Sequence, residues 1–295
     1  MGQYVISCCS TVDLTAEHLA KRDIAWIPFH FYLDDKHYLD DLGKSISYED
    51  FYNAMTNGAD TRTSQVNVEE YIAAFEKHLK EGKDVLHLTL SSGISGTFNS
   101  ASIAANELKE RYPERKIYVI DSLAASSGYG LLMDGVADKR DEGLTIDELR
   151  DWVEENKLKL HHWFFSTDLT FYVKGGRVSK TAGLIGGALK ICPLLNVDYK
   201  GRLIPREKIR TRKRAMKAAV AKMLEHADDG SSYNGKAYVY HSAIEPEARE
   251  LAAMVEEAFP KMSEPVLVCN IGTTIGAHTG PGTIGLSFWG DKRED

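Results

Sequence analysis

The sequence lacks the features that mark a membrane-spanning, secreted or nucleic-acid-binding chain. None of its apolar runs approaches the roughly 20 residues that a transmembrane helix needs. Its 36 Lys and Arg stand against 43 Asp and Glu, a formal net charge of −7, so no basic excess can displace counterions from nucleic-acid phosphates. The opening residues, MGQYVISCCS, contain no charged n-region, long apolar h-region or small-residue cleavage site, so we expect no signal peptide. These absences predict a cytoplasmic protein with no nucleic-acid partner.

Cysteine is also scarce. The four cysteines, Cys8, Cys9, Cys192 and Cys269, have no metal-ligand spacing. Cys8 and Cys9 are neighbours in an expected strand and would point to opposite faces of its sheet. We therefore expect reduced, buried thiols and no metal site.

What is present predicts a globular α/β chain. The 295 residues are 43% hydrophobic and 27% charged, which fits one large domain or two of ordinary size. Up to about residue 160, short apolar runs alternate with helical patterns, as in a mostly parallel sheet flanked by helices. Ser47, Asn67 and Thr145 each stand three residues before an acid and are expected to cap helices. The expected strands are 4–10, 24–33, 85–90 and 116–120, and expected helices include 48–56, 68–80, 97–111 and 146–158.

The pattern changes to α+β after residue 160. Lys200-Gly201 is flanked by the segments 192–199 and 202–208, and it indicates an antiparallel hairpin. We predict two domains, residues 1–160 and 161–295. Further expected strands are 161–166, 236–241 and 265–271. Further expected helices are 181–190, 213–226 and 245–259. The chain ends in a Gly-rich tail that contains AHTGPG.

One polar segment lies where parallel sheets place their ligand sites. Residues 91–97, SSGISGT, directly follow the strand VLHLTL and open the next helix. Three serine hydroxyls and free backbone N–H groups at a helix N-terminus form a site for an anion. The alternative is an ordinary Ser/Thr cap with glycines for a tight turn.

Three more polar segments are ambiguous when each is taken alone. Residues 61–65 (TRTSQ) resemble a polar loop before a cap, and residues 174–179 (KGGRVS) resemble a solvated helix end with a cation. In residues 276–282 (GAHTGPG), His278 stands beside a Gly-Pro-Gly turn that holds its backbone rigidly, which suits an orienting or proton-handling role. A lone histidine is more often structural.

Together these segments resemble the DegV family. Five segments follow one another in the family's order along essentially the whole chain. They are Thr-Ser-Gln, SSGISGTFNSA, Asp121-Ser122 after a strand, GGRVSK and H-x-GPG. The family includes the fatty-acid-binding subunits of bacterial fatty acid kinase. The resemblance implies a two-domain fold with one long-chain fatty acid held between the domains.

The resemblance also implies site residues. Thr63, Ser95 and His278 match the positions that hydrogen-bond the buried fatty-acid carboxylate, and Arg177 matches a position linked to the head group and to kinase engagement. Further expected head-group or kinase contacts are Ser10, Ser92, Gly96, Thr97 and Gly280. The chain departs from the family pattern at Cys9-Ser10-Thr11, where relatives usually have Asp-Ser-Thr, and at Val66-Asn67 in place of Pro-Ser.

The residue types suit a carrier. Each buried methylene contributes about 0.8 kcal/mol, so a tail of sixteen or so carbons could yield roughly 12 kcal/mol gross without a strong ion pair at the carboxylate. We find no P-loop and no kinase metal-ligand pattern, so we expect a non-enzymatic subunit that needs no cofactor and presents its fatty acid to a separate kinase for acyl-phosphate formation and phospholipid synthesis.

Two stretches have both an ordinary and a functional interpretation. The runs LIGGAL (184–189) and IAWIPFHF (24–31) could line a tail tunnel, although plain core is the more common role of such residues. The seven cations of residues 206–217 fit a solvated face, or else a docking surface for an acidic partner or for anionic lipid during transient membrane contact.

A serine esterase is the alternative function. Ser95 sits at an expected strand-to-helix turn, as a nucleophile elbow would, and His278 follows later in the chain. Thr97 stands where that motif needs glycine, and no loop signal marks an Asp in the expected place before His278. Labelling of Ser95 by a fluorophosphonate probe discriminates the two functions.

Overall fold

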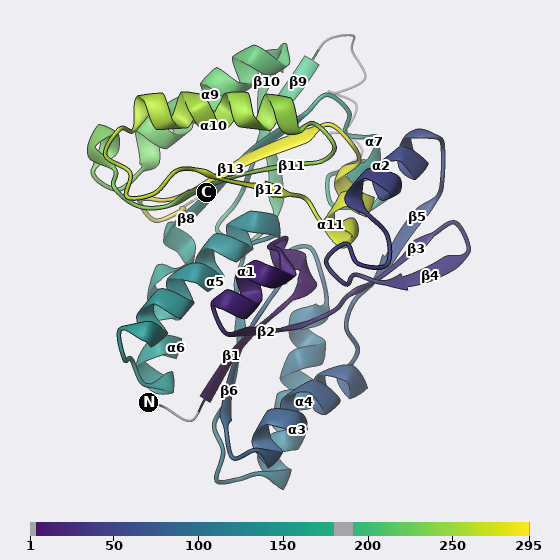
Figure 1. Ribbon diagram of the computed structural model, residues 1–295, viewed down its shortest axis with the longest axis vertical. Helices are drawn as coiled ribbons and strands as arrows, with labels where there is room; N and C mark the ends of the chain where they lie inside the picture. The colour runs from purple at the N-terminus through teal and green to yellow at the C-terminus, as the bar shows by residue number, and fades with distance from the viewer. Residues whose placement is uncertain (1–3, 180–190, 295) are drawn as a thin grey trace.

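The computed structural model describes residues 4–179 and 191–294 (Figure 1). The helix predicted over residues 181–190, with its LIGGAL segment at 184–189, lies outside the described residues. Within the described part of the chain, no helix is both long and apolar enough to cross a bilayer.

A four-stranded parallel sheet forms the first part of the chain. It contains β1 (Tyr4–Cys9), β2 (Ile24–Ile27), β6 (Asp84–Thr89) and β7 (Ile117–Asp121), with α1 (Ala16–Lys21), α3 (Val68–Lys80), α4 (Thr97–Arg111), α5 (Ser126–Asp141) and α6 (Ile146–Asn156). The strand order is β2-β1-β6-β7, and every neighbouring pair is parallel. Because parallel strands need a crossover, α1 connects β1 to β2 and α4 connects β6 to β7. The predicted parallel α/β architecture is confirmed.

The predicted helix caps are also confirmed. The Asn67 side chain accepts a hydrogen bond from the Glu70 backbone N–H, and the Glu70 carboxylate accepts one from the Asn67 backbone N–H, both at 2.9 Å. Thr145 and Glu148 form the same capping box at the start of α6. The box at Asn67 fixes where α3 begins, directly after the Thr-Ser-Gln segment.

A six-stranded mixed sheet forms the second part. It contains β8 (Leu160–Ser166), β9 (Ile191–Val197), β10 (Leu203–Arg210), β11 (Ala237–His241), β12 (Leu267–Asn270) and β13 (Thr283–Trp289). The order is β10-β9-β8-β13-β11-β12, with antiparallel neighbours except for β11 and β12. The predicted hairpin is confirmed, and Gly201 adopts φ +70° at its tip. Since the first sheet uses strands before residue 160 and the second uses strands from 160 onward, we propose this point as the domain boundary.

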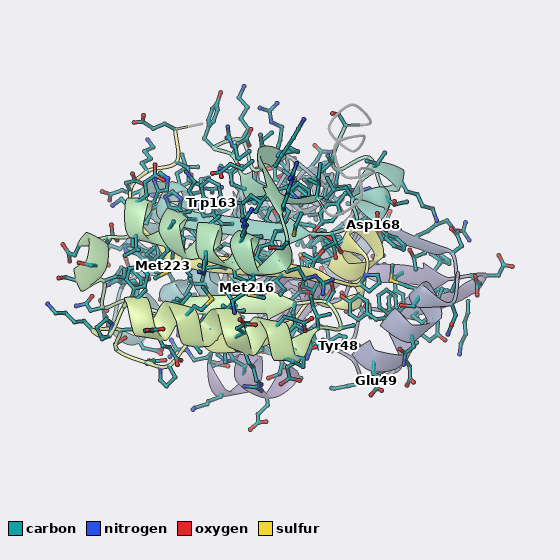
Figure 2. The ribbon with its side chains drawn as sticks, turned by 90° about the horizontal axis from the view of Figure 1, so that it is seen from above. Tyr48, Glu49, Trp163, Asp168, Met216 and Met223 are labelled. Carbon is teal, nitrogen blue, oxygen red and sulfur yellow. The ribbon has the colours of Figure 1, made fainter. Side chains whose placement is uncertain are left out.

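Two helices cover one face of the six-stranded sheet. Figure 1 shows α9 (Arg212–His226) and α10 (Glu245–Ala258) side by side above it. Trp163, Met216 and Met223 belong to the core cluster between this sheet and its helices (Figure 2). At the start of α9, Arg212 and Lys213 form ion pairs with Glu247 and Glu250 of α10, so part of the basic run is neutralised within the chain.

A third, small antiparallel sheet lies beside the other two. It contains β3 (His30–Leu33), β4 (Lys36–Leu39) and β5 (Thr61–Ser64) in the order β4-β3-β5, next to α2 (Tyr48–Thr56), α7 (Thr170–Lys174) and α11 (Thr273–Thr279). The single run expected over 24–33 divides into β2 and β3 around Pro28. The expected polar loop at 61–65 is wrong, because Thr63 pairs with Phe31 in this sheet.

Helix α5 separates the two large sheets. It packs against β8, β11 and β13 on one side and against β1 and the 3₁₀ turn η1 (Ser10–Val12) on the other. The sequence pattern did not predict α5, because a helix buried on all sides has no polar face to create a 3.6-residue period. Strand β13, expected only as part of a Gly-rich tail, is a central strand of the second sheet.

The segment after β13 forms hydrogen bonds with both parts of the chain, before and after residue 160. The guanidinium of Arg293 is buried, and it donates hydrogen bonds to the carbonyls of Val197, Asp198, Leu123 and Lys157 at 2.9–3.3 Å. These carbonyls come from both sides of residue 160. The four cysteines are free thiols, with Cys269 partly exposed and the other three buried.

Candidate functional site

A cavity of about 370 Å³ lies where the three sheets meet. This volume is within the ~300–1,000 Å³ range typical of small-molecule sites. Loops after β6 and β7 contribute to its wall, so it lies at the carboxyl ends of the parallel strands. Its apolar and aromatic lining includes Phe29, Leu90, Ile94, Phe164, Tyr172, Val197, Leu203, Tyr240, Ile271 and Ile275.

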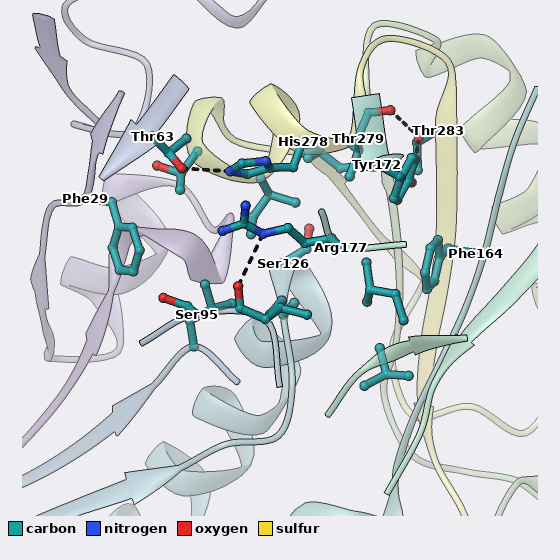
Figure 3. Close-up of a pocket in the computed structure, with 18 of the residues that line it drawn as sticks. Phe29, Thr63, Ser95, Ser126, Phe164, Tyr172, Arg177, His278, Thr279 and Thr283 are labelled. Atoms are coloured by element: carbon teal, nitrogen blue, oxygen red, sulfur yellow. Dashed lines mark hydrogen bonds between the residues drawn. The ribbon is translucent and has the colours of Figure 1, made fainter. Parts of the chain in front are cut away.

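Four polar lining side chains gather at one end, whereas Thr283 lies farther along the cavity, 3.0 Å from the Tyr172 hydroxyl. Figure 3 shows Thr63, Ser95, Arg177 and His278 close together, with Phe164 and Tyr172 farther along the cavity. These four residues come from β5, the loop before α4, the loop after α7, and α11. The cavity therefore has a polar end, and the rest of its lining is mostly apolar.

Thr63 and His278 form the central contact of the polar end. Thr63 Oγ1 lies 2.7 Å from His278 Nε2, a hydrogen bond between residues 215 positions apart. The C-cap of α11 is Gly280, with φ +68°, so the helix ends immediately after His278 and Thr279. The small sheet holds the threonine and the helix end holds the histidine, which fixes both partners on regular elements.

The histidine is held in its neutral form. Burial, together with the nearby charge of Arg177, lowers the pKa of His278 to about 4. A neutral imidazole keeps one N–H donor and one nitrogen acceptor. The polar end therefore offers hydrogen bonds without a fixed positive charge from the histidine.

The pKa of His278 predicts a specific acid sensitivity. Between about 4 and the ordinary 6.5, the unfolded chain binds a proton at this imidazole that the folded chain does not, so acidification through this window lowers the free energy of unfolding. We expect His278→Gln to remove this difference of up to one bound proton between the folded and unfolded chains. The slope of the unfolding free energy against pH should then fall by up to about 1.4 kcal/mol per pH unit in this window. Urea unfolding of both proteins at several pH values measures the difference, and equal slopes would contradict the assignment.

The SSGISGT loop serves both as a structural turn and as part of the lining. Ser95 Oγ accepts a hydrogen bond from the Thr97 backbone N–H at 3.2 Å, and Ser95 lines the cavity. Ser91 Oγ instead donates to the Gly201 carbonyl at 2.8 Å, so the hairpin tip of the second sheet rests on this loop. An added Cβ at Gly93 would come within 2.5 Å of the Lys200 carbonyl oxygen, and glycine therefore permits this close approach.

Arg177 borders the same end from the loop after α7. Its Nε donates to the Ile94 carbonyl at 3.3 Å and its Nη1 donates to the Gly175 carbonyl. Burial lowers the pKa of this guanidinium below its ordinary value. Its hydrogen bonds connect the GGR turn to the SSGISGT loop.

The other predicted contacts have different surroundings. Gly96 lines the cavity, whereas Ser10, Ser92, Thr97 and Gly280 do not. Thr97 Oγ1 lies 2.6 Å from the Tyr71 hydroxyl, the Ser92 N–H donates to Asp121, and the Gly280 carbonyl accepts from Ser242.

An acidic side chain lies beside the loop after β1, although Cys9 stands where relatives usually have aspartate. The Cys9 thiol is buried against Tyr71, at 3.3 Å from the hydroxyl. Ser10 Oγ donates to Asp40 Oδ2 at 3.1 Å and accepts from the Phe29 N–H at 3.0 Å. Asp40 thus supplies a carboxylate beside Ser10, and Ser10 in turn positions Phe29 at the cavity wall.

Several lining residues were not predicted. His162 and Phe164 both face the cavity because alternate residues of β8 share one face of the sheet, a period of two that the run HHWFFS hides among bulky side chains. Of the IAWIPFHF run, Phe29 lines the cavity, whereas Ile24 and Ile27 belong to the core. Ser126, the first residue of the unpredicted α5, also lines it.

The contacts of an esterase triad are not formed. His278 Nε2 bonds Thr63, and within residues 4–179 and 191–294 no hydrogen bond joins Ser95 to His278 or a carboxylate to His278. A nucleophilic serine needs an adjacent base that a third group orients. The geometry favours hydrogen bonding of a ligand over attack on one.

Known proteins are similar to this chain in sequence and in fold. Residues 6–291 match the family described as "Uncharacterised protein, DegV family". A DegV domain-containing protein of Clostridium perfringens is 36% identical over 294 residues, which is 100% of each chain. The structure of DegV, a fatty acid binding protein from Bacillus subtilis, is 28% identical with a TM-score of 0.82 over 99% of this chain and 100% of that one.

A third comparison shows the fold alone. The Streptococcus pneumoniae Fatty Acid Kinase (Fak) B3 protein, loaded with linoleic acid, has a TM-score of 0.84 at 23% identity, covering 99% of this chain and 100% of that one. The family match and the Clostridium relative each span nearly the full sequence. The chain therefore belongs to the DegV family.

Proposed function

We propose that this protein binds one long-chain fatty acid in the cavity, with the carboxylate at Thr63, Ser95 and His278. The observation that carries the proposal is the Thr63–His278 hydrogen bond at one end of a mostly apolar cavity. A fatty acid has the matching distribution, one polar end and an apolar chain. The Bacillus subtilis relative, a fatty acid binding protein, supports the same ligand class.

The head-group chemistry suits a ligand that must later react. Ser95 can donate its hydroxyl proton to a carboxylate. Thr63 and neutral His278 share one hydrogen bond, so when His278 Nε2–H donates to Thr63 Oγ1, the Thr63 hydroxyl proton is left to donate to the carboxylate. Arg177 uses its Nε and Nη1 on two backbone carbonyls, so we propose that its guanidinium holds the loop and does not lock the carboxylate in an ion pair. An oxygen held only by hydrogen bonds stays nucleophilic toward a phosphoryl donor.

We further propose that a separate kinase phosphorylates the bound carboxylate and that this chain supplies no catalytic residue. The family resemblance supports this step, and the Fak B3 protein, which has the same fold, suggests it. The test is to mix loaded protein with Mg-ATP and trap any acyl phosphate as a hydroxamate with hydroxylamine. We expect product only when a fatty acid kinase catalytic subunit is added. Product from this chain alone would contradict the carrier role.

Calorimetric titration tests the ligand proposal directly. Delipidated protein is titrated with a long-chain fatty acid and, as a control, with the corresponding alcohol, which keeps the tail and lacks the carboxylate. We expect one site per chain for the acid and weaker binding of the alcohol. Equal affinity for both would contradict the role of the polar end, and no binding of either would contradict the proposal.

Gly175 gives a sharper test of the histidine. An added Cβ there would lie 2.3 Å from His278 Nδ1, although the backbone φ of −74° accepts any residue. Gly175→Ala should displace the imidazole and cost about one hydrogen bond, 0.5–1.5 kcal/mol, or roughly 2- to 12-fold in fatty-acid affinity.

Gly176→Ala is the matched control for this substitution. It adds the same methyl group one residue later, where nothing lies within 4 Å, although its φ of +73° is strained for alanine. The control should lose stability and keep its affinity. Equal loss of affinity in both variants would point to the loop backbone instead of to His278.

A further inference from the structure

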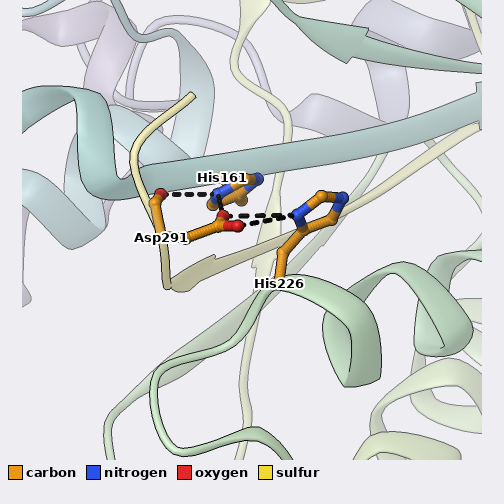
Figure 4. A group of neighbouring side chains, drawn as sticks. All are labelled: His161, His226 and Asp291. Carbon is orange, nitrogen blue, oxygen red and sulfur yellow. Dashed lines mark hydrogen bonds and ion pairs between the residues drawn. The ribbon is translucent and has the colours of Figure 1, made fainter. Parts of the chain in front are cut away.

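A second cluster of polar side chains lies on the opposite face of β8 from the cavity. His162 faces the cavity, and its neighbour His161 points the other way, toward α9 and the C-terminal segment. His226 is the last residue of α9, and Asp291 follows β13. Figure 4 shows the three side chains converging.

These side chains bring three donor atoms to one point. His161 Nε2 lies 2.9 Å from Asp291 Oδ1, and His226 Nδ1 lies 3.2 Å from the same oxygen. One donor atom from each residue fits within a span of 4.8 Å. A tetrahedral ion with bonds of about 2.0–2.2 Å holds its donors about 3.3–3.6 Å apart, so small rotations of the side chains suffice.

The backbone holds the cluster in place. The Asp291 N–H donates to the His226 carbonyl at 2.9 Å, and the Gly290 N–H donates to the Lys159 carbonyl at 2.8 Å. An added Cβ at Gly290 would come within 2.1 Å of the His226 carbonyl oxygen, so glycine permits the two segments to touch. The approach of β13's end to α9 is therefore built into the fold.

The histidine rings are also oriented. His161 stacks on His226 with ring centroids 4.9 Å apart, and on Phe288 at 5.3 Å with an interplanar angle of 5°. Trp163 packs against the same His226 ring at 6.0 Å. Rings fixed by stacking lose little freedom when they bind an ion.

Solvent can reach the cluster from one side. The side-chain exposures are 6% for His161, 25% for His226 and 61% for Asp291, so the cluster opens at the carboxylate. Glu225 lies 3.8 Å from the other nitrogen of His226 and adds negative charge at this opening. An incoming cation has an entry path, and water can complete its coordination.

We propose that His161, His226 and Asp291 form a site for a divalent transition-metal ion of the zinc class, with three protein ligands and one or more waters. Two imidazoles and one carboxylate are a donor set that favours such ions over Mg²⁺ or Ca²⁺, which prefer all-oxygen sites. On binding, the proton at His161 Nε2 moves to Nδ1 and the proton at His226 Nδ1 moves to Nε2, since both now point to Asp291, and the two freed lone pairs bind the ion. The bound ion joins β8, α9 and the C-terminal segment that carries Arg293.

The test uses the full chain without a histidine tag. Zn²⁺ is titrated by calorimetry, and Co²⁺ is added separately because its visible absorption reports tetrahedral nitrogen and oxygen ligands. We expect one ion per chain, a higher melting temperature with Zn²⁺, and at least a tenfold loss of affinity in His226→Gln and in Asp291→Asn. Both substituted positions are partly or largely exposed, so the variants should fold.

Two controls separate this cluster from other histidines. His37→Gln changes the exposed His30–His37 pair, and Asp35→Asn removes a fully exposed carboxylate. Both should bind the metal as the unsubstituted protein does. Absence of binding, or equal binding by the cluster variants and the controls, would overturn the proposal.

Discussion

Replacing Thr63 with valine should weaken fatty-acid binding by roughly 10- to 150-fold. Valine keeps the shape and suits the β5 strand, but it removes the hydroxyl that lies 2.7 Å from His278 Nε2. A hydrogen bond to a charged group is worth about 1.5–3 kcal/mol, and each 1.4 kcal/mol is tenfold in affinity. Calorimetric titration of both proteins with the same fatty acid measures the change.

Thr63→Ser is the control for that substitution. It keeps the hydroxyl and loses only the methyl group, so its affinity should stay much closer to that of the unsubstituted protein. If valine and serine reduced affinity equally, the loss would not be specific to the hydroxyl, and this would contradict the role given to the hydrogen bond. If neither substitution changed affinity, the carboxylate would have to lie elsewhere.

Replacing Leu203 with tryptophan should lower affinity by about 200-fold for long chains. Leu203 begins β10 and lines the apolar part of the cavity, where an indole would occupy space that the tail needs. If about four methylenes of the tail can no longer be buried, the binding free energy falls by roughly 3 kcal/mol. The loss should shrink for shorter fatty acids, since their tails do not reach the obstruction.

Leu224 supplies the matched control for tail obstruction. It lies on α9 with 45% of its surface exposed, away from the cavity, so Leu224→Trp adds the same side chain without filling the site. Its affinity should be unchanged at every chain length. A Leu203→Trp protein that bound long and short acids equally well would contradict the placement of the tail.

Local sequence signals predicted much of the fold. The bounds predicted for α4, residues 97–111, agree with the structure, and the capping box at Asn67 placed the start of α3. The hairpin at Lys200-Gly201 was equally clear, because its turn residues are local. These elements carry their own start and stop signals within a few residues.

The elements that were missed depend on distant parts of the chain. Helix α5 is buried between two sheets and has no polar face, and β13 is defined by its pairing with β8 and β11. Thr63 illustrates the same point for the site, since its strand exists only through pairing with β3. The family resemblance could place Thr63 near His278, although no local pattern links residues 215 positions apart.

Mass spectrometry of the purified protein tests the central claim most directly. Native and denaturing spectra are compared, and whatever is released is extracted into organic solvent and identified. The account predicts one fatty acid per chain in the native spectrum, lost on denaturation and depleted in Ser95→Ala and His278→Ala. A native mass equal to the bare chain, in a protein that also takes up no added fatty acid, would contradict it.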